Sequence, residues 1–119
     1  MTPEGLVKKR VKELLAQYFP IRVEMPVQTG YGKKTLDFIV TYRGRTIVIE
    51  TKAEKKHPTE LQRQDMREYR DAGAFIFVIM GVNDPQLERL RLTLERWSMT
   101  PATPGFVYGD ELALPQVIE

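Results

Sequence analysis

Residues 36–52, LDFIVTYRGRTIVIETK, contain two strand-like runs that are separated by only two residues. The runs Leu36–Tyr42 and Arg45–Thr51 are rich in β-branched and aromatic residues, and Arg43-Gly44 between them suits a two-residue hairpin turn. A turn of this length sets the register, because the residues that flank it must face each other. The sequence therefore predicts an antiparallel β-hairpin at the centre of the fold.

Helices and further strands are predicted on both sides of the hairpin. Before the hairpin we expect a helix over 3–18, with Thr2 as N-cap, and a strand over 21–27; the apolar stripe of that helix is Val7, Val11, Leu14, Leu15 and Tyr18. After the hairpin we expect a helix over 59–71 closed by Gly73 and a strand over 74–80. A last helix is capped by Asn83 or Asp84 and buries Leu87, Leu90, Leu94 and Trp97. The order helix, three strands, helix, strand, helix indicates one α/β layer sandwich.

The composition limits the kind of site that this chain can carry. With 119 residues, 42% of them hydrophobic, it suits one domain with a modest core. It has no cysteine and a single histidine, which excludes disulfide frameworks, thiolate zinc sites and histidine-rich metal sites. Any bound metal must therefore be held mainly by oxygen atoms, which favours hard ions such as Mg²⁺, Mn²⁺ or Ca²⁺.

Net charge and hydropathy give little information about binding partners. A net charge of +2 is too small by itself to indicate a nucleic-acid binder. No stretch approaches the roughly 18 uninterrupted apolar residues of a membrane span, and the N-terminus MTPEGLVKKR lacks the apolar centre of a signal peptide. We therefore expect a soluble cytoplasmic protein with no membrane partner.

The hairpin register predicts a cluster of charged residues at one end of the sheet. Counted back from the turn, Asp37 should lie directly opposite Glu50 on the same face of the sheet. Opposed carboxylates destabilise a sheet unless something neutralises them, and a divalent cation would do so. Lys52 should share the face of Glu50, because side chains alternate along a strand. The alternative is that all three residues simply face solvent at the strand ends.

This arrangement suits the hydrolysis of a phosphodiester. That reaction needs a cation to screen the phosphate and activate water, and an ammonium group to stabilise the nucleophile or the developing charge. Asp37 and Glu50 would hold the cation, and Lys52 would supply the ammonium. The side chain of Thr51 should point the other way, but its backbone carbonyl is a further hard ligand.

The same residues resemble a known nuclease motif. Asp37 followed by Ile49-Glu50-Thr51-Lys52 after an apolar strand resembles the Asp…Glu-x-Lys core of the restriction-endonuclease-like superfamily, written PD-(D/E)xK. Thr59-Glu60-Leu61-Gln62, with Tyr69, Ala72-Gly73 and the apolar run 75–80 behind it, is similar to the virus-type replication-repair nuclease (VRR-NUC) family. The resemblance covers residues 4–81. It departs from the family at Thr35-Leu36, where a glycine and a proline usually precede the aspartate.

This resemblance implies a restriction-endonuclease-like core with a mixed β-sheet flanked by helices. It implies that Asp37 and Glu50 bind Mg²⁺ or Mn²⁺, that Lys52 is catalytic, and that Glu4 completes the carboxylate set. Glu4 also falls on the apolar stripe of the first predicted helix, as such a role requires. An acidic residue in a first turn stabilises the helix by itself, so this position has two explanations.

Gln62 is expected to belong to the same site. It matches the last position of the family's Ser/Thr-x-x-Gln and shares a helical stripe with Met66 and Tyr69, so it should point inward. A buried amide needs a polar partner. That partner is either the active-site network, with Gln62 as a catalytic residue, or the polar rim at the start of the helix.

Several basic and aromatic residues are candidates for DNA binding, namely Tyr31, Lys33, Lys34, Lys55 and Lys56. Tyr31 lies between two glycines and suits stacking on a base, although a plain flexible turn explains it equally well. The lysine pairs are also explained as solvated surface. His57 has no acid partner in the sequence and is expected to be a surface-loop residue.

The sequence thus leads to a metal-dependent DNA endonuclease. Residues 1–97 would form a VRR-NUC-like nuclease domain, and the Pro/Gly-rich extension 98–119 would pack on it. The resemblance further implies a Holliday-junction resolvase that cuts branched DNA as a homodimer, in a bacterial or phage-infected cell. The alternatives are a nuclease for flaps, ends or single-stranded DNA, and a DNA-binding module that keeps the fold without cleaving.

Overall fold

The computed structural model describes residues 1–26 and 36–101. Its elements are α1 (Pro3–Leu15), β1 (Arg22–Glu24), β2 (Phe38–Tyr42), β3 (Arg45–Lys52), α2 (Glu60–Asp71), β4 (Phe75–Met80) and α3 (Pro85–Ser98). The predicted α/β class and the predicted order of elements are confirmed. The first helix and the first strand are shorter than predicted.

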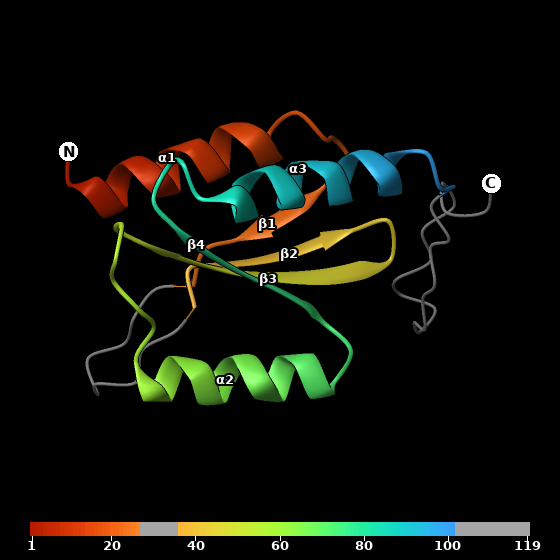
Figure 1. Cartoon of the computed structure of the whole chain (residues 1–119). Helices are drawn as coiled ribbons and strands as arrows, with labels where there is room; N and C mark the ends of the chain where they lie inside the picture. The colour runs from red at the N-terminus through yellow and green to blue at the C-terminus, as the bar shows by residue number, and fades with distance from the viewer. Residues whose placement is uncertain (27–35, 102–119) are drawn as a thin grey trace.

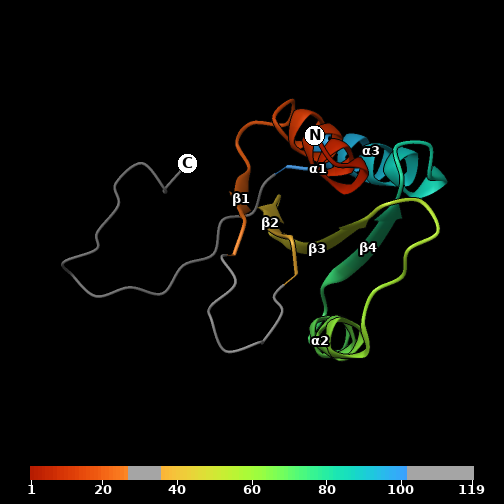
Figure 2. The ribbon, with the colours of Figure 1, turned by 90° about the vertical axis from the view of Figure 1, so that its left-hand side faces the viewer.

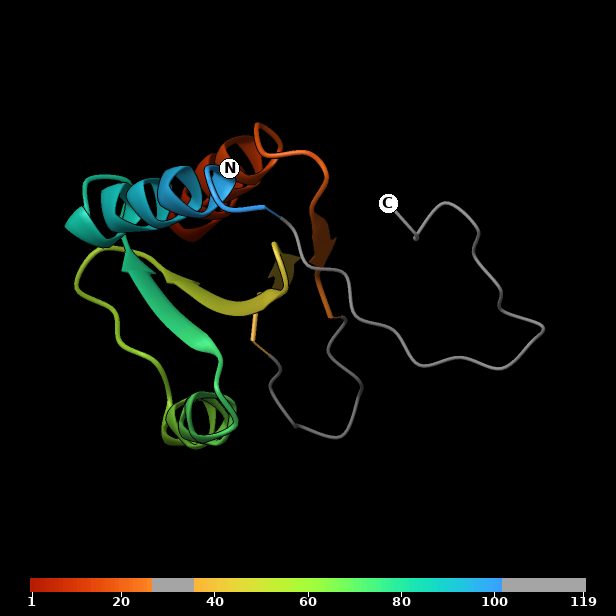
Figure 3. The ribbon, with the colours of Figure 1, turned by 90° about the vertical axis from the view of Figure 1, so that its right-hand side faces the viewer.

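The strands form one mixed sheet in the order β1-β2-β3-β4 (Figure 1). β1 and β2 are antiparallel, as are β2 and β3, whereas β3 and β4 are parallel. A parallel pair needs a crossover connection, which α2 provides here. As a result α1 and α3 cover one face of the sheet and α2 covers the other (Figures 2 and 3).

The hairpin register is the predicted one. Tyr42 pairs with Arg45, and the pairing continues in step as far as Phe38 and Ile49. The turn residues Arg43 and Gly44 have φ angles of 52° and 77°. A hairpin turn with positive φ at both central residues has a twist that matches the twist of the flanking strands. Glycine adopts a positive φ without strain.

Apolar residues form a cluster on each face of the sheet. Between the sheet and the two helices α1 and α3 lie Val7, Val11, Leu14, Leu15, Phe38, Val40, Tyr42, Ile47, Ile49, Phe77, Ile79, Leu90, Leu94 and Trp97. On the α2 face lie Leu36, Val48 and Met66, with Tyr69, Ala74, Ile76 and Val78 packed against them. Alternate residues of β3 therefore enter different clusters, as the period of a strand requires.

Each helix begins at a side-chain cap. Thr2 accepts a hydrogen bond from the backbone of Gly5, and Asp84 accepts one from Gln86. Thr59 forms a capping box with Gln62 at the start of α2. These caps satisfy backbone N–H groups that a helix leaves unpaired in its first turn, so the predicted starts are correct to within a residue.

Some predictions fall outside the described residues. Tyr31, Lys33 and Lys34 do so, as does all of the proposed C-terminal extension beyond residue 101. Within the part of the chain that is described, no helix has the length and apolar character needed to cross a membrane.

Candidate active site

Glu50 and Lys52 lie on β3 and face α2. Two residues after the buried Val48, Glu50 is only 1% exposed. The Lys52 ammonium lies 3.3 Å from Glu50 Oε2, and the Lys52 side chain is 14% exposed. The prediction that these two residues share one face is confirmed, and the alternative of solvent-facing charges at the strand end is wrong for Glu50.

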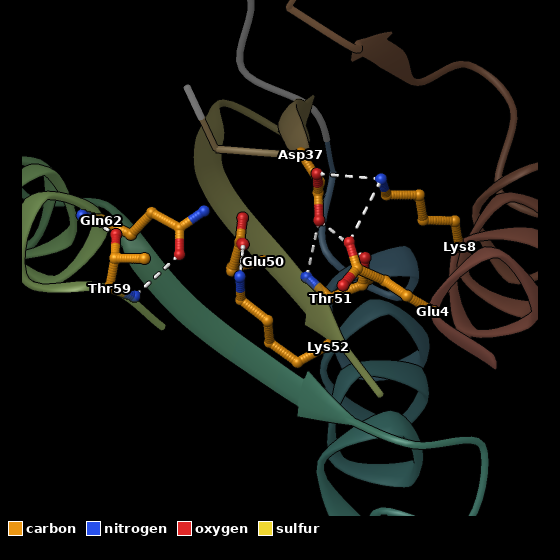
Figure 4. Close-up of polar contacts among 8 residues, drawn as sticks. All are labelled: Glu4, Lys8, Asp37, Glu50, Thr51, Lys52, Thr59 and Gln62. Carbon is orange, nitrogen blue, oxygen red and sulfur yellow. Dashed lines mark hydrogen bonds and ion pairs between the residues drawn. The ribbon is translucent and has the colours of Figure 1, made fainter. Parts of the chain in front are cut away.

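Asp37 lies immediately before β2 at the same end of the sheet (Figure 4). Its Oδ2 accepts two hydrogen bonds from Thr51, one from the backbone N–H at 2.8 Å and one from the hydroxyl at 2.6 Å. Its Oδ1 lies 3.5 Å from the ammonium of Lys8 on α1. The carboxylate therefore points toward Thr51 and α1.

The strand pairing that would place Asp37 directly opposite Glu50 stops one step short of these two residues. Strand pairing between β2 and β3 ends at Phe38 and Ile49. Beyond that point the N–H of Thr51 has no strand partner, and a buried N–H must find another acceptor. The Asp37 carboxylate supplies it, and its charge still lies close enough to Glu50 to raise the pKa of that carboxyl group.

The backbone carbonyl of Thr51 points toward the side of β3 where Asp37 lies. The next carbonyl, that of Lys52, accepts a hydrogen bond from Gly81 N–H at 2.9 Å on the β4 side. Because successive carbonyls of a strand point to opposite edges, Thr51 directs its carbonyl the same way as its N–H. The Thr51 carbonyl is thus a third oxygen donor beside the two carboxylates.

The pKa of Glu50 is unusually high for a carboxyl group. Burial, followed by the nearby charge of Asp37, raises its pKa from 4.5 to about 7, against the opposing effect of Lys52. Its Oε1 is buried and has no hydrogen-bond partner among residues 1–26 and 36–101. A buried, unpaired carboxylate oxygen lowers the stability of the fold unless it binds a proton or a cation.

Lys8 is a member of the site that the sequence did not identify. Its ammonium lies 3.5 Å from Glu4 Oε2 as well as 3.5 Å from Asp37 Oδ1. The interactions with both carboxylates raise the pKa of Lys8 against the effect of its partial burial, which is the largest single influence and acts in the opposite direction. Only its spacing of four from Glu4 was a signal in the sequence, and that spacing is common on helix surfaces.

Gln62 points inward, as predicted, and is 4% exposed. Its side-chain oxygen accepts a hydrogen bond from the backbone N–H of Thr59 at 2.9 Å. The backbone N–H of Gln62 donates to the Thr59 hydroxyl at 3.2 Å. Its amide nitrogen points toward Glu50 (Figure 4). The capping role of this residue is therefore confirmed, while its place in an active-site network stays a prediction.

The oxygen donors form a smaller group than the sequence suggested. Among residues 1–26 and 36–101, no three or more acidic or histidine side chains lie together so as to hold a metal ion. Glu4, Asp37 and Glu50 thus do not meet as one carboxylate set, because Lys8 lies between Glu4 and Asp37. What remains is Asp37, Glu50 and the Thr51 carbonyl.

The predicted DNA-binding lysines are described only in part. Lys55 and Lys56 are exposed in the loop that follows β3, directly after the Glu50–Lys52 pair. His57 is exposed in the same loop, in agreement with its assignment as a surface residue. Positive charge therefore lies on the surface of the loop that follows Lys52 in the chain.

Comparison with known proteins adds no relative. The chain matches no protein-family model, no curated protein and no solved structure. Its function has to be argued from its own residues and their geometry.

Proposed function

We propose that this chain is a metal-dependent DNA endonuclease that hydrolyses phosphodiester bonds. The observation that carries the proposal is the buried Glu50, whose Oε1 has no hydrogen-bond partner within the described part of the chain while its Oε2 is paired with Lys52 at 3.3 Å. Burying a carboxylate in this way costs stability, so a structural role alone does not explain it. Strongly perturbed carboxyl groups beside a fixed cationic side chain are characteristic of functional sites.

The donor atoms fit a hard divalent cation. Asp37, Glu50 and the Thr51 carbonyl offer only oxygen, which is the chemistry that Mg²⁺ and Mn²⁺ prefer. When bound there, Mg²⁺ or Mn²⁺ would screen the phosphate charge and lower the pKa of a water molecule. The unpartnered Glu50 Oε1 is the oxygen that such an ion would satisfy.

The surrounding side chains have distinct roles in this proposal. Lys52, held by Glu50, places a positive charge where the attacking hydroxide or the developing phosphorane charge needs stabilisation. Gln62 is held by its capping box so that its NH₂ group can donate to the same region. Thr51 orients the Asp37 carboxylate through two hydrogen bonds. The catalytic residues are therefore Asp37, Glu50, Lys52 and Gln62.

The fold supports the proposed family as well as the chemistry. The resemblance to PD-(D/E)xK and VRR-NUC nucleases implies that the acidic residues lie at the end of a hairpin whose second strand bears Glu-x-Lys. In this chain Asp37 precedes β2, and Glu50 and Lys52 end β3. We infer a restriction-endonuclease-like core over residues 1–97 on that correspondence.

For the substrate we propose branched DNA, cut by a homodimer with two symmetric sites. A chain of 13.8 kDa offers little surface for holding a four-way junction alone. Lys33, Lys34, Lys55 and Lys56 would bind the phosphate backbone, and Tyr31 would stack on a base. A flap, an end or single-stranded DNA as the preferred substrate is an alternative outcome of the test below.

The test compares three labelled substrates, namely a four-way junction, a 5′-flap and a linear duplex, each with Mg²⁺, Mn²⁺ or EDTA. We expect cleavage with either metal and none with EDTA, with the junction cut fastest. Lys52→Ala should lower the rate by a factor of about 10² or more. Lys12→Ala, which removes an exposed lysine from α1, should leave the rate unchanged.

Three outcomes would count against parts of this proposal. Absence of cleavage on every substrate would overturn the nuclease function and leave a DNA-binding module. Cleavage that survives Lys52→Ala unchanged would overturn the assigned mechanism. A particle of only 13.8 kDa by light scattering at micromolar concentration would contradict the homodimer.

A further inference from the structure

Lys8 connects two carboxylates that belong to different parts of the fold. Glu4 lies one helical turn before Lys8 on α1, and Asp37 lies at the start of β2. The Lys8 ammonium is 3.5 Å from an oxygen of each (Figure 4). It therefore stands where a cation bound jointly by Glu4 and Asp37 would otherwise be placed.

The acceptor capacity of Asp37 is almost fully used by these contacts. An ionised carboxylate has about four lone-pair positions, two on each oxygen. On Oδ2 both are occupied by the N–H and the hydroxyl of Thr51. On Oδ1 one is occupied by Lys8. With the contacts of the described residues counted, one position remains, on Oδ1.

That count decides how many ions Asp37 can help to bind. Two-metal phosphodiester sites hold their ions about 3.5–4 Å apart. A carboxylate shared between two such ions must offer a free lone pair to each. Asp37 has one to offer, so it can ligate one ion while Lys8 remains in place.

Charge leads to the same conclusion. The two carboxylates Glu4 and Asp37 and the single ammonium of Lys8 carry a formal charge of −1, since two negative charges are offset by one positive charge. A second divalent ion held between Glu4 and Asp37 would have to take the place of the Lys8 ammonium and would be repelled by it. Without Lys8 the same pair would carry −2, which suits a divalent ion.

We propose that Lys8 limits this site to one divalent cation by holding a fixed positive charge between Glu4 and Asp37. The inference rests on the proposed metal-dependent function and deepens it. Lys8 is a positioning residue in this scheme, since it acts through Asp37. The single ion would then be bound by Asp37, Glu50 and the Thr51 carbonyl.

The experiment is a Mn²⁺ titration of the metal-free full-length protein without DNA, in which free Mn²⁺ is followed by electron paramagnetic resonance. We expect one ion per chain for the wild type and two for Lys8→Met. Lys8→Arg keeps the charge and should bind one ion. The double variant Lys8→Met/Glu4→Gln should return to one, because the second site has lost a ligand.

Lys9→Met is the matched control, since Lys9 is the exposed neighbour of Lys8 on the same helix. It should bind one ion, and circular dichroism should confirm that every variant is folded. One ion for both wild type and Lys8→Met, or two for the wild type, overturns the inference and leaves the nuclease proposal standing. No ion in either protein overturns both.

Discussion

Thr51 and Asp37 join the ends of the two central strands by a pair of hydrogen bonds rather than by continued strand pairing. Both donors of Thr51, its N–H at 2.8 Å and its hydroxyl at 2.6 Å, bind the same carboxylate oxygen of Asp37. Hydrogen bonds to an ionised acceptor are stronger than neutral ones. The Asp37 carboxylate is therefore fixed in orientation by the strand that also carries Glu50 and Lys52.

Thr51→Val tests this relationship, because valine keeps the branched shape and the backbone donor but loses the hydroxyl. We expect a loss of about 1–3 kcal/mol in the free energy of unfolding. Mn²⁺ affinity should fall about 10- to 100-fold, as is usual when a residue that orients a metal ligand is removed. Urea unfolding and Mn²⁺ titration would measure the two effects. Thr41→Val, at an exposed position of β2, is the control, and equal behaviour of the two variants would contradict the role of Thr51.

Glu50 should make the stability of the metal-free protein depend on pH. Burial and the charge of Asp37 raise its pKa from 4.5 to about 7 in the folded chain. The folded state then binds more protons than the unfolded state between these values, so the free energy of unfolding falls as pH rises from about 4.5 to 7. The contribution of this residue is up to about 3 kcal/mol.

Urea unfolding in EDTA at several pH values would measure this dependence against Glu50→Gln, which cannot ionise. The stabilising effect of the variant relative to the wild type should grow as pH rises through that window. Added Mn²⁺ should raise the stability of the wild type at neutral pH more than that of the variant, because it binds the folded state. A constant difference between the two proteins across the window would contradict the raised pKa.

Variants at Gln62 and Thr59 should distinguish the helix-capping role of Gln62 from its proposed catalytic role. Thr59→Ala removes the capping hydroxyl and should cost about 1 kcal/mol of stability, with most of the cleavage rate retained. Gln62→Met removes the capping oxygen and also the NH₂ group that faces Glu50, so cleavage should fall at least about 10-fold. Both variants would be compared by urea unfolding and by the junction-cleavage rate. Equal cleavage by the two variants would show that Gln62 acts only as a cap.

Leu94 and Leu92 should respond very differently to truncation, although both lie on α3. Leu94 is fully buried against the sheet, whereas Leu92 is 49% exposed. Leu94→Ala should lower the free energy of unfolding by about 2–5 kcal/mol because it leaves a cavity. Leu92→Ala should change it by about 0.5 kcal/mol or less. Similar values for the two variants would contradict the packing of α3 on this face.

Features set by residues close in sequence were predictable without the structure. The two-residue turn at Arg43-Gly44 determined the hairpin register, because a short turn leaves the flanking residues no other pairing. Thr2, Thr59 and Asp84 marked the helix starts, since caps act on backbone groups only two or three residues away. The position of Lys52 on the face of Glu50 followed from the alternation of a strand.

Features set by contacts between distant segments became visible only in the tertiary structure. The two hydrogen bonds from Thr51 to the Asp37 carboxylate lie beyond the last pair of the hairpin, where the register of the turn no longer predicts side-chain partners. Lys8 reaches Asp37 only because α1 packs across that end of the sheet. The sequence by itself thus determined the elements, the hairpin and the identity of the acidic and basic residues. Packing decided which of them meet, because side-chain partners at the end of a sheet depend on where the neighbouring helices lie.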